Sequence, residues 1–116
     1  MNQPSTRVIV AGDLAGNIAS FRRSLAASNR APRTLQTYVE GVERFQRYLA
    51  EMGMPGDLAA IRREHVESFM EHLLGTGKPS SAANRYRSLQ AFFKWALEEG
   101  EVAAQAVEAV TWLADA

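Results

Sequence analysis

The chain has 116 residues, of which 47% are hydrophobic and 22% charged, and it contains no cysteine. This length fits one globular domain with a single core, and the lack of cysteine excludes disulfides and thiolate metal sites. No apolar run approaches the ~20 residues that cross a bilayer. The N-terminal segment has only a four-residue apolar run, Val8 to Ala11, so no signal peptide is expected and the predicted location is cytoplasmic.

The formal net charge is zero, which taken alone argues against a nucleic-acid-binding protein. The charges are, however, unevenly distributed along the chain. Residues 1–47 contain seven arginines and three acids, and residues 76–97 contain four basic residues and no acid. Residues 48–75 contain two arginines and five acids, and residues 98–116 contain five acids and no base. The balanced total therefore hides two basic blocks.

Residues 1–12 are predicted to form a flexible arm, and Asp13 is a suitable N-cap for a first helix. The apolar face of this helix is predicted to contain Ile18, Phe21, Leu25 and Ala26.

A second helix is predicted from Pro32, which suits a first turn, to about Met52, before Gly53. Its apolar residues recur in alternating steps of three and four: Leu35, Tyr38, Val42, Phe45, Leu49 and Met52. The opposite face carries Arg33, Thr37, Glu40, Arg44 and Arg47.

Two further helices and a tail complete the pattern. A helix over about 62–74 is predicted to turn Val66, Phe69, Met70 and Leu73 inward and Glu64, Glu67 and Glu71 outward. A helix capped by Ser80 or Ser81 is predicted to run to about Glu99, with Ala82, Tyr86, Leu89, Phe92, Phe93, Trp95 and Ala96 inward. After Gly100, a short fifth helix is predicted with Val107, Val110 and Leu113 on one side. No segment alternates with period two, so the expected fold is an all-α bundle of four to five helices, with a helical domain over 13–104 and a tail over 105–116.

No catalytic motif is present. His65 and His72 lie two helical turns apart, about 10 Å, which is too far for both to reach one metal ion. We find no phosphate-binding glycine loop, nucleophile elbow or carboxylate pair. The sequence therefore predicts no cofactor, no metal site, no small-molecule substrate and no activity for this chain alone.

Polar and basic side chains gather where the second and fourth helices begin. Free backbone N–H groups at a helix start favour anions, and these residue types hold phosphates and contact base edges. The residues predicted to bind nucleic acid are Arg33, Thr34, Thr37, Ser81, Asn84, Arg85 and Arg87. A solvated surface explains any one such helix, but two helices that share this feature favour DNA or RNA binding.

Three segments occur in an order that resembles a known family. They are the pattern T-x3-Y-x6-F formed by Thr34, Tyr38 and Phe45, then HVESFMEHLL, then SSAANRYRSLQAFFKWALEEG. Together they resemble the N-terminal core-binding domain of tyrosine recombinases, the phage integrase family, over residues 14 to about 104. The resemblance implies a SAM-like bundle that precedes a catalytic domain and clamps duplex DNA through its second and fourth helices.

The resemblance also implies roles for individual residues. Arg33 and Thr37 match polar contacts that flank the family's threonine, here Thr34, and Ser81 stands where a threonine is common. Asn84, Arg85 and Arg87 follow in the first turns of that helix. Other recombinase protomers would be partners on DNA, and the tail, with Trp112, would contact a neighbour or pack on its own bundle.

Two departures from the family pattern affect these expectations. Gln105 and Ala106 occupy the positions of a usual Asn-Pro, and the family's catalytic boxes do not follow. Strand exchange is therefore expected of a longer parent or relative and not of any residue here. The alternatives to DNA binding are a helical protein-interaction module, since this fold is used in both ways, and an enzyme with an unrecognised site, for which a small bundle has little room.

Overall fold

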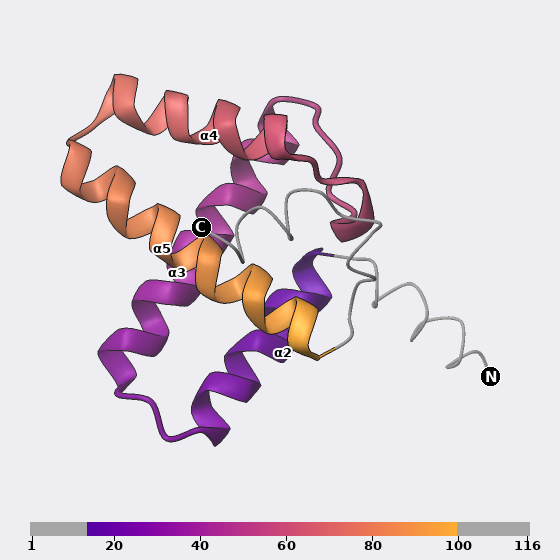
Figure 1. Cartoon of the computed structure of the whole chain (residues 1–116), viewed down its shortest axis with the longest axis vertical. Helices are drawn as coiled ribbons and strands as arrows, with labels where there is room; N and C mark the ends of the chain where they lie inside the picture. The colour runs from indigo at the N-terminus through magenta and orange to yellow at the C-terminus, as the bar shows by residue number, and fades with distance from the viewer. Residues whose placement is uncertain (1–13, 100–116) are drawn as a thin grey trace.

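In the computed structural model, residues 14–99 are described, and they form four α-helices and one short 3₁₀-helix (Figure 1). In chain order the elements are α2 (Leu14–Ala27), α3 (Pro32–Glu51), η1 (Leu58–Ala60), α4 (Arg63–Thr76) and α5 (Pro79–Glu98). No strand occurs in this range, so the all-α prediction is confirmed. The predicted arm, the Asp13 cap and the tail after Gly100 lie outside the described residues, and the proposed boundaries at 13, 104 and 105 stay predictions.

Helix α3 forms where the sequence predicts it. Pro32 occupies the first turn, and the chain leaves the helix at Met52 and turns at Gly53, whose φ is +68°. Because Met52 lies beyond the last helical turn, it does not continue the apolar face and is 56% exposed. The remaining predicted apolar positions of α3 are buried or half-buried.

The predicted serine cap of α5 is wrong. The N-cap is Lys78, which makes no side-chain capping hydrogen bond, and Pro79 is the first helical residue. Proline's fixed φ and missing N–H suit that position better than the position before it. Ser80 and Ser81 therefore lie inside the first turn, where the Ser81 N–H donates to the Lys78 carbonyl at 3.1 Å.

The two other helices differ slightly from expectation. In α2, Ala26 is exposed, because it lies about 100° round the helix from Leu25 and so leaves the buried stripe. That stripe extends instead toward the N-terminus, to Leu14 and Asn17. Helix α4 begins at Arg63, with Arg62 as its N-cap residue. The backbone N–H of Arg62 donates a hydrogen bond to His65 Nδ1 at 2.8 Å.

Aromatic side chains form the centre of the core. Phe45 of α3 contacts Phe69 of α4 and Phe93 of α5, with ring centroids 5.1 and 6.4 Å apart. Phe21 of α2 meets Phe92 of α5 edge-on at 5.3 Å. These contacts hold every α-helix of the described chain against α5 or α3, because large aromatic rings bury the most apolar surface.

Helices α3 and α5 approach most closely at Gly41 and Ser88. A Cβ at position 41 would overlap Ser88 Cβ and lie 2.5 Å from its Oγ, so only glycine fits this approach. The Ser88 side chain is fully buried, and its hydroxyl donates to the Thr37 carbonyl of α3 (3.3 Å) and the Asn84 carbonyl of α5 (3.1 Å). Figure 1 shows α3 and α5 crossing each other.

No helix within residues 14–99 has both the length and the apolar character that a membrane span requires.

Replacing Gly41 with alanine should destabilise the domain by about 1–3 kcal/mol, because the added methyl group forces Ser88 or α5 to move. Urea unfolding followed by circular dichroism measures this change. Gly75 of α4 is the matched control, since a Cβ there meets nothing within 4 Å. Alanine at position 75 should be neutral or stabilise by up to about 1 kcal/mol. Equal effects at the two positions would contradict the close approach.

Candidate nucleic-acid interface

The predicted contact residues occupy the N-terminal halves of two crossing helices. Arg33 is exposed and Thr34 half-buried in the first turn of α3, and Ser81 is exposed in the first turn of α5. Both helices begin on the left of Figure 1 and diverge from their crossing toward that side. The predicted residues in the first turns of α3 and α5 therefore lie on two helix ends that diverge from the same crossing.

Three of the predicted residues come together at the crossing itself. Ser88 joins Thr37 and Asn84 through its two hydrogen bonds to their carbonyl oxygens. Arg85 lies one turn before Ser88, and a Cβ at Gly41 would lie 3.8 Å from Arg85 Cδ. The crossing thus places a half-buried guanidinium of α5 directly beside α3.

The surroundings of Arg85 are mostly positive. Burial lowers the pKa of Arg85 most, and the charges of Arg44 and, to a smaller degree, Arg47 lower it further. Glu40 acts in the opposite direction and raises this pKa. We call Arg44, Arg47 and Arg85 the crossing cluster: three arginines from two helices, in which the charges of Arg44 and Arg47 act on Arg85.

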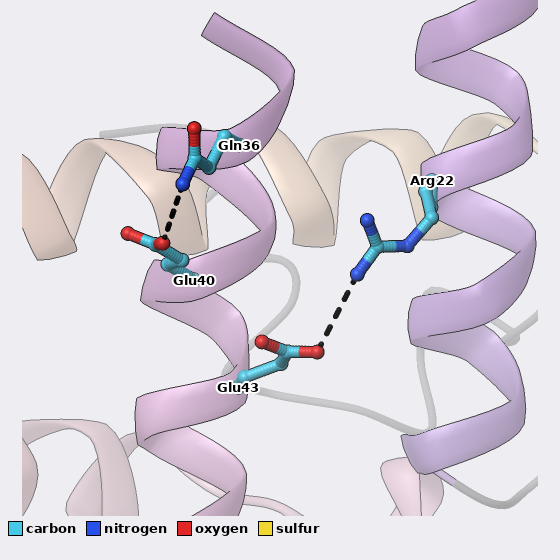
Figure 2. A network of polar contacts seen from close by, with 4 residues as sticks. All are labelled: Arg22, Gln36, Glu40 and Glu43. Atoms are coloured by element: carbon cyan, nitrogen blue, oxygen red, sulfur yellow. Dashed lines mark hydrogen bonds and ion pairs between the residues drawn. The ribbon is translucent and has the colours of Figure 1, made fainter. Parts of the chain in front are cut away.

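The two nearby carboxylates have different partners, an arginine for Glu43 and a neutral amide for Glu40 (Figure 2). Glu43 pairs with Arg22 of α2 at 3.6 Å, and Glu40 accepts a hydrogen bond from Gln36 Nε2 at 3.1 Å. Within residues 14–99 the only other salt bridge joins Arg63 to Glu67 at 3.0 Å. The arginines of the crossing cluster therefore have no salt bridge to a carboxylate in the described part of the chain.

Arg87 is not brought to the crossing cluster. It lies two residues after Arg85, about 200° round the helix, and so faces away from Arg85. Its Nη2 donates a short hydrogen bond to Asn84 Oδ1. Asn84 thus connects Arg87 to the crossing through its side chain while its carbonyl binds Ser88.

The sequence places Arg44 and Arg47 on the basic outer face of the α3 helix, but it does not show which residues of α5 lie beside them. The sequence does not show where along their lengths α3 and α5 cross. Once Gly41 contacts Ser88, the turn of α3 that follows Gly41 lies beside Arg85. A lone glycine opposite a small residue of another helix is a signal that would have located it.

The two histidines have separate surroundings. His65 accepts the hydrogen bond at the start of α4, and the ring of His72 lies 5.1 Å from that of Tyr48. No three metal-ligating side chains are grouped together in residues 14–99.

Comparison with known families adds independent information. The family model of the phage integrase N-terminal SAM-like domain matches residues 18–100, which include α3, α4, α5 and most of α2. No curated protein and no solved structure gives a significant match. The match spans well over half of the chain and agrees with the helical bundle and with the order of the sequence segments. The chain therefore belongs to the family of phage integrase N-terminal SAM-like domains.

Proposed function

We propose that this chain is the core-binding domain of a site-specific tyrosine recombinase and binds duplex DNA through α3 and α5. The observation that carries the proposal is the crossing cluster. Arg44 and Arg47 of α3 act as like charges on Arg85 of α5, against the single opposite charge of Glu40, and none of the three arginines has a salt bridge among the described residues. Phosphate groups would neutralise this charge.

Guanidinium groups suit this role, because their planar donors match phosphate oxygens and stay charged at any physiological pH. Binding would release counterions from the duplex and would therefore weaken as salt is added. An isolated domain would bind as non-specific complexes do, with a dissociation constant of about 10⁻⁴–10⁻⁶ M.

Six of the seven predicted residues divide into two groups in this proposal, and Arg87 stands apart. Arg33, Thr34 and Ser81 lie in first turns, where side chains and free backbone N–H groups would hold phosphates. Thr37, Asn84 and Arg85 lie at the crossing, where side chains would contact the groove edge. Arg87 would hold a flanking phosphate through its position beside Asn84.

The outer face of α4 would point away from DNA. Glu64, Glu67 and Glu71 are all exposed on this face, and carboxylates facing phosphates would cost affinity. The duplex would therefore approach from the side of α3 and α5. In the parent recombinase, strand exchange would belong to the catalytic domain, and other protomers on DNA would be the protein partners.

Replacing Arg33 or Arg85 with alanine should weaken binding to a short random duplex about tenfold, since each change removes a charge-assisted contact. The slope of the logarithm of the binding constant against the logarithm of the salt concentration is expected near −5 for the domain. In each variant this slope should become shallower by about 0.9. Fluorescence anisotropy at several salt concentrations measures both quantities. Arg23 of α2, an exposed arginine bonded to Ser20, is the matched control and should have little effect.

Unchanged affinity in both variants would contradict the proposed face. Absence of any salt-dependent binding to duplex DNA would favour a protein-interaction module instead, because the fold alone does not choose between the two functions.

Repulsion within the crossing cluster gives a second prediction, on the free domain. Raising the NaCl concentration from about 20 to about 200 mM screens like charges, so it should stabilise the wild-type domain more than the Arg85→Gln variant. Urea unfolding at the two concentrations measures the difference. Arg23→Gln should respond to salt like the wild type. An identical response of all three proteins would show that the cluster carries no unfavourable charge energy.

A further inference from the structure

A polar pocket that shares Arg44 and Arg47 with the crossing cluster lies between the C-terminal half of α3 and α4. It is a pocket of about 160 Å³ whose lining residues all come from these two helices. Arg44, Arg47 and Glu51 of α3 and His72 of α4 supply its polar groups. Figure 1 shows α4 passing the end of α3, away from the N-terminal half that carries Arg33.

The wall of the pocket is held in place by contacts between the two helices. Tyr48 is 8% exposed, and its hydroxyl hydrogen-bonds to Ser68 Oγ of α4 at 2.5 Å. The Tyr48 ring also packs on Phe69, with centroids 5.3 Å apart, and on His72 at 5.1 Å and 36° between planes. The imidazole of His72 is therefore positioned at the rim while remaining exposed to solvent.

The charge of the pocket is positive. Two arginines face one glutamate, and neither arginine takes part in a salt bridge within residues 14–99. The volume is several times the ~30 Å³ that a water molecule occupies in the liquid. A tetrahedral oxyanion with a few waters fits this space, and the planar guanidinium groups and an imidazolium are the donors that such an anion requires.

We propose that this pocket binds a single phosphate group, with Arg44, Arg47 and the protonated imidazole of His72 as donors and the Tyr48 ring as its wall. The inference rests on the proposed function, because Arg44 and Arg47 also belong to the crossing cluster. The phosphate would then be one of the DNA backbone, and the pocket would extend the DNA-binding face from α5 across α3 to α4. A free phosphate ion shares the same chemistry.

Histidine in this position makes phosphate binding depend on pH. The charged or titratable groups around His72 are Arg44, Arg47, Tyr48 and Glu51 on α3, with Glu71 adjacent on α4. None of the lining residues comes from α5. Of these side-chain types, histidine alone ordinarily changes its charge between about pH 5 and 8. Binding and protonation of His72 therefore favour each other, and the affinity should rise as the pH falls.

The test measures duplex affinity at about pH 6 and about pH 8 and follows the His72 imidazole by NMR in the full chain. The wild type should bind about three- to tenfold more tightly at the lower pH, as one added charged contact provides. In the His72→Gln variant, the affinity for the duplex should be the same at the two pH values. His65→Gln is the matched control, because His65 is the other histidine of the chain and caps α4 instead; it should keep the ratio.

A separate titration with inorganic phosphate distinguishes the source of the ligand. Imidazole shifts with both the duplex and the ion support the pocket as a DNA phosphate site. Shifts with the ion, in a chain that binds no duplex, support the pocket but overturn the proposed function. Equal pH ratios in the two histidine variants, with no imidazole shift in the wild type, overturn the pocket. Weakened duplex binding by Arg85→Ala would still support the proposed function in that case.

Discussion

The contact between Gly41 and Ser88 determines how the rest of this domain is arranged. Because position 41 has no Cβ, α5 can lie directly on α3, and a buried serine hydroxyl then satisfies carbonyl oxygens of both helices. This approach sets which turns of the helices become neighbours. Arg85, one turn from Ser88, consequently lies beside Arg44 and Arg47.

The charges of Arg44 and Arg47 disfavour the charged form of Arg85, and the aromatic core stabilises the fold that brings these residues together. Phe45 packs against Phe69 of α4 and Phe93 of α5, while Phe21 and Phe92 join α2 to α5. Burial of these rings is non-directional and large, so it can hold like charges at a fixed spacing on the surface above. A face held in this way needs little rearrangement to meet an anion, which is why we regard the cluster as prepared for phosphate.

Helix α4 has two faces with different electrostatic character. Its outward glutamates repel phosphate, whereas His72, stacked on Tyr48, turns toward the arginines of α3. The pocket between α3 and α4 therefore continues the positive surface of the crossing, and the acidic face would limit how far a duplex extends around the domain. The family assignment agrees with a DNA-binding role and does not itself specify these contacts.

The sequence by itself determined the helical class, nearly all of the helix spans, the two basic blocks and the family resemblance. These follow from local periodicity and from proline and glycine positions, which act within a few residues. The sequence predicted the wrong N-cap for α5 and predicted burial for Ala26, which is exposed. In both cases adjacent residues of one helical turn were candidates for the same place, and the sequence pattern selected the wrong residue. Only the tertiary structure decided that Arg44 and Arg47 join Arg85. That outcome depends on where two helices cross, and the hydrogen bond from Ser88 to Thr37 spans 51 residues, beyond any local pattern.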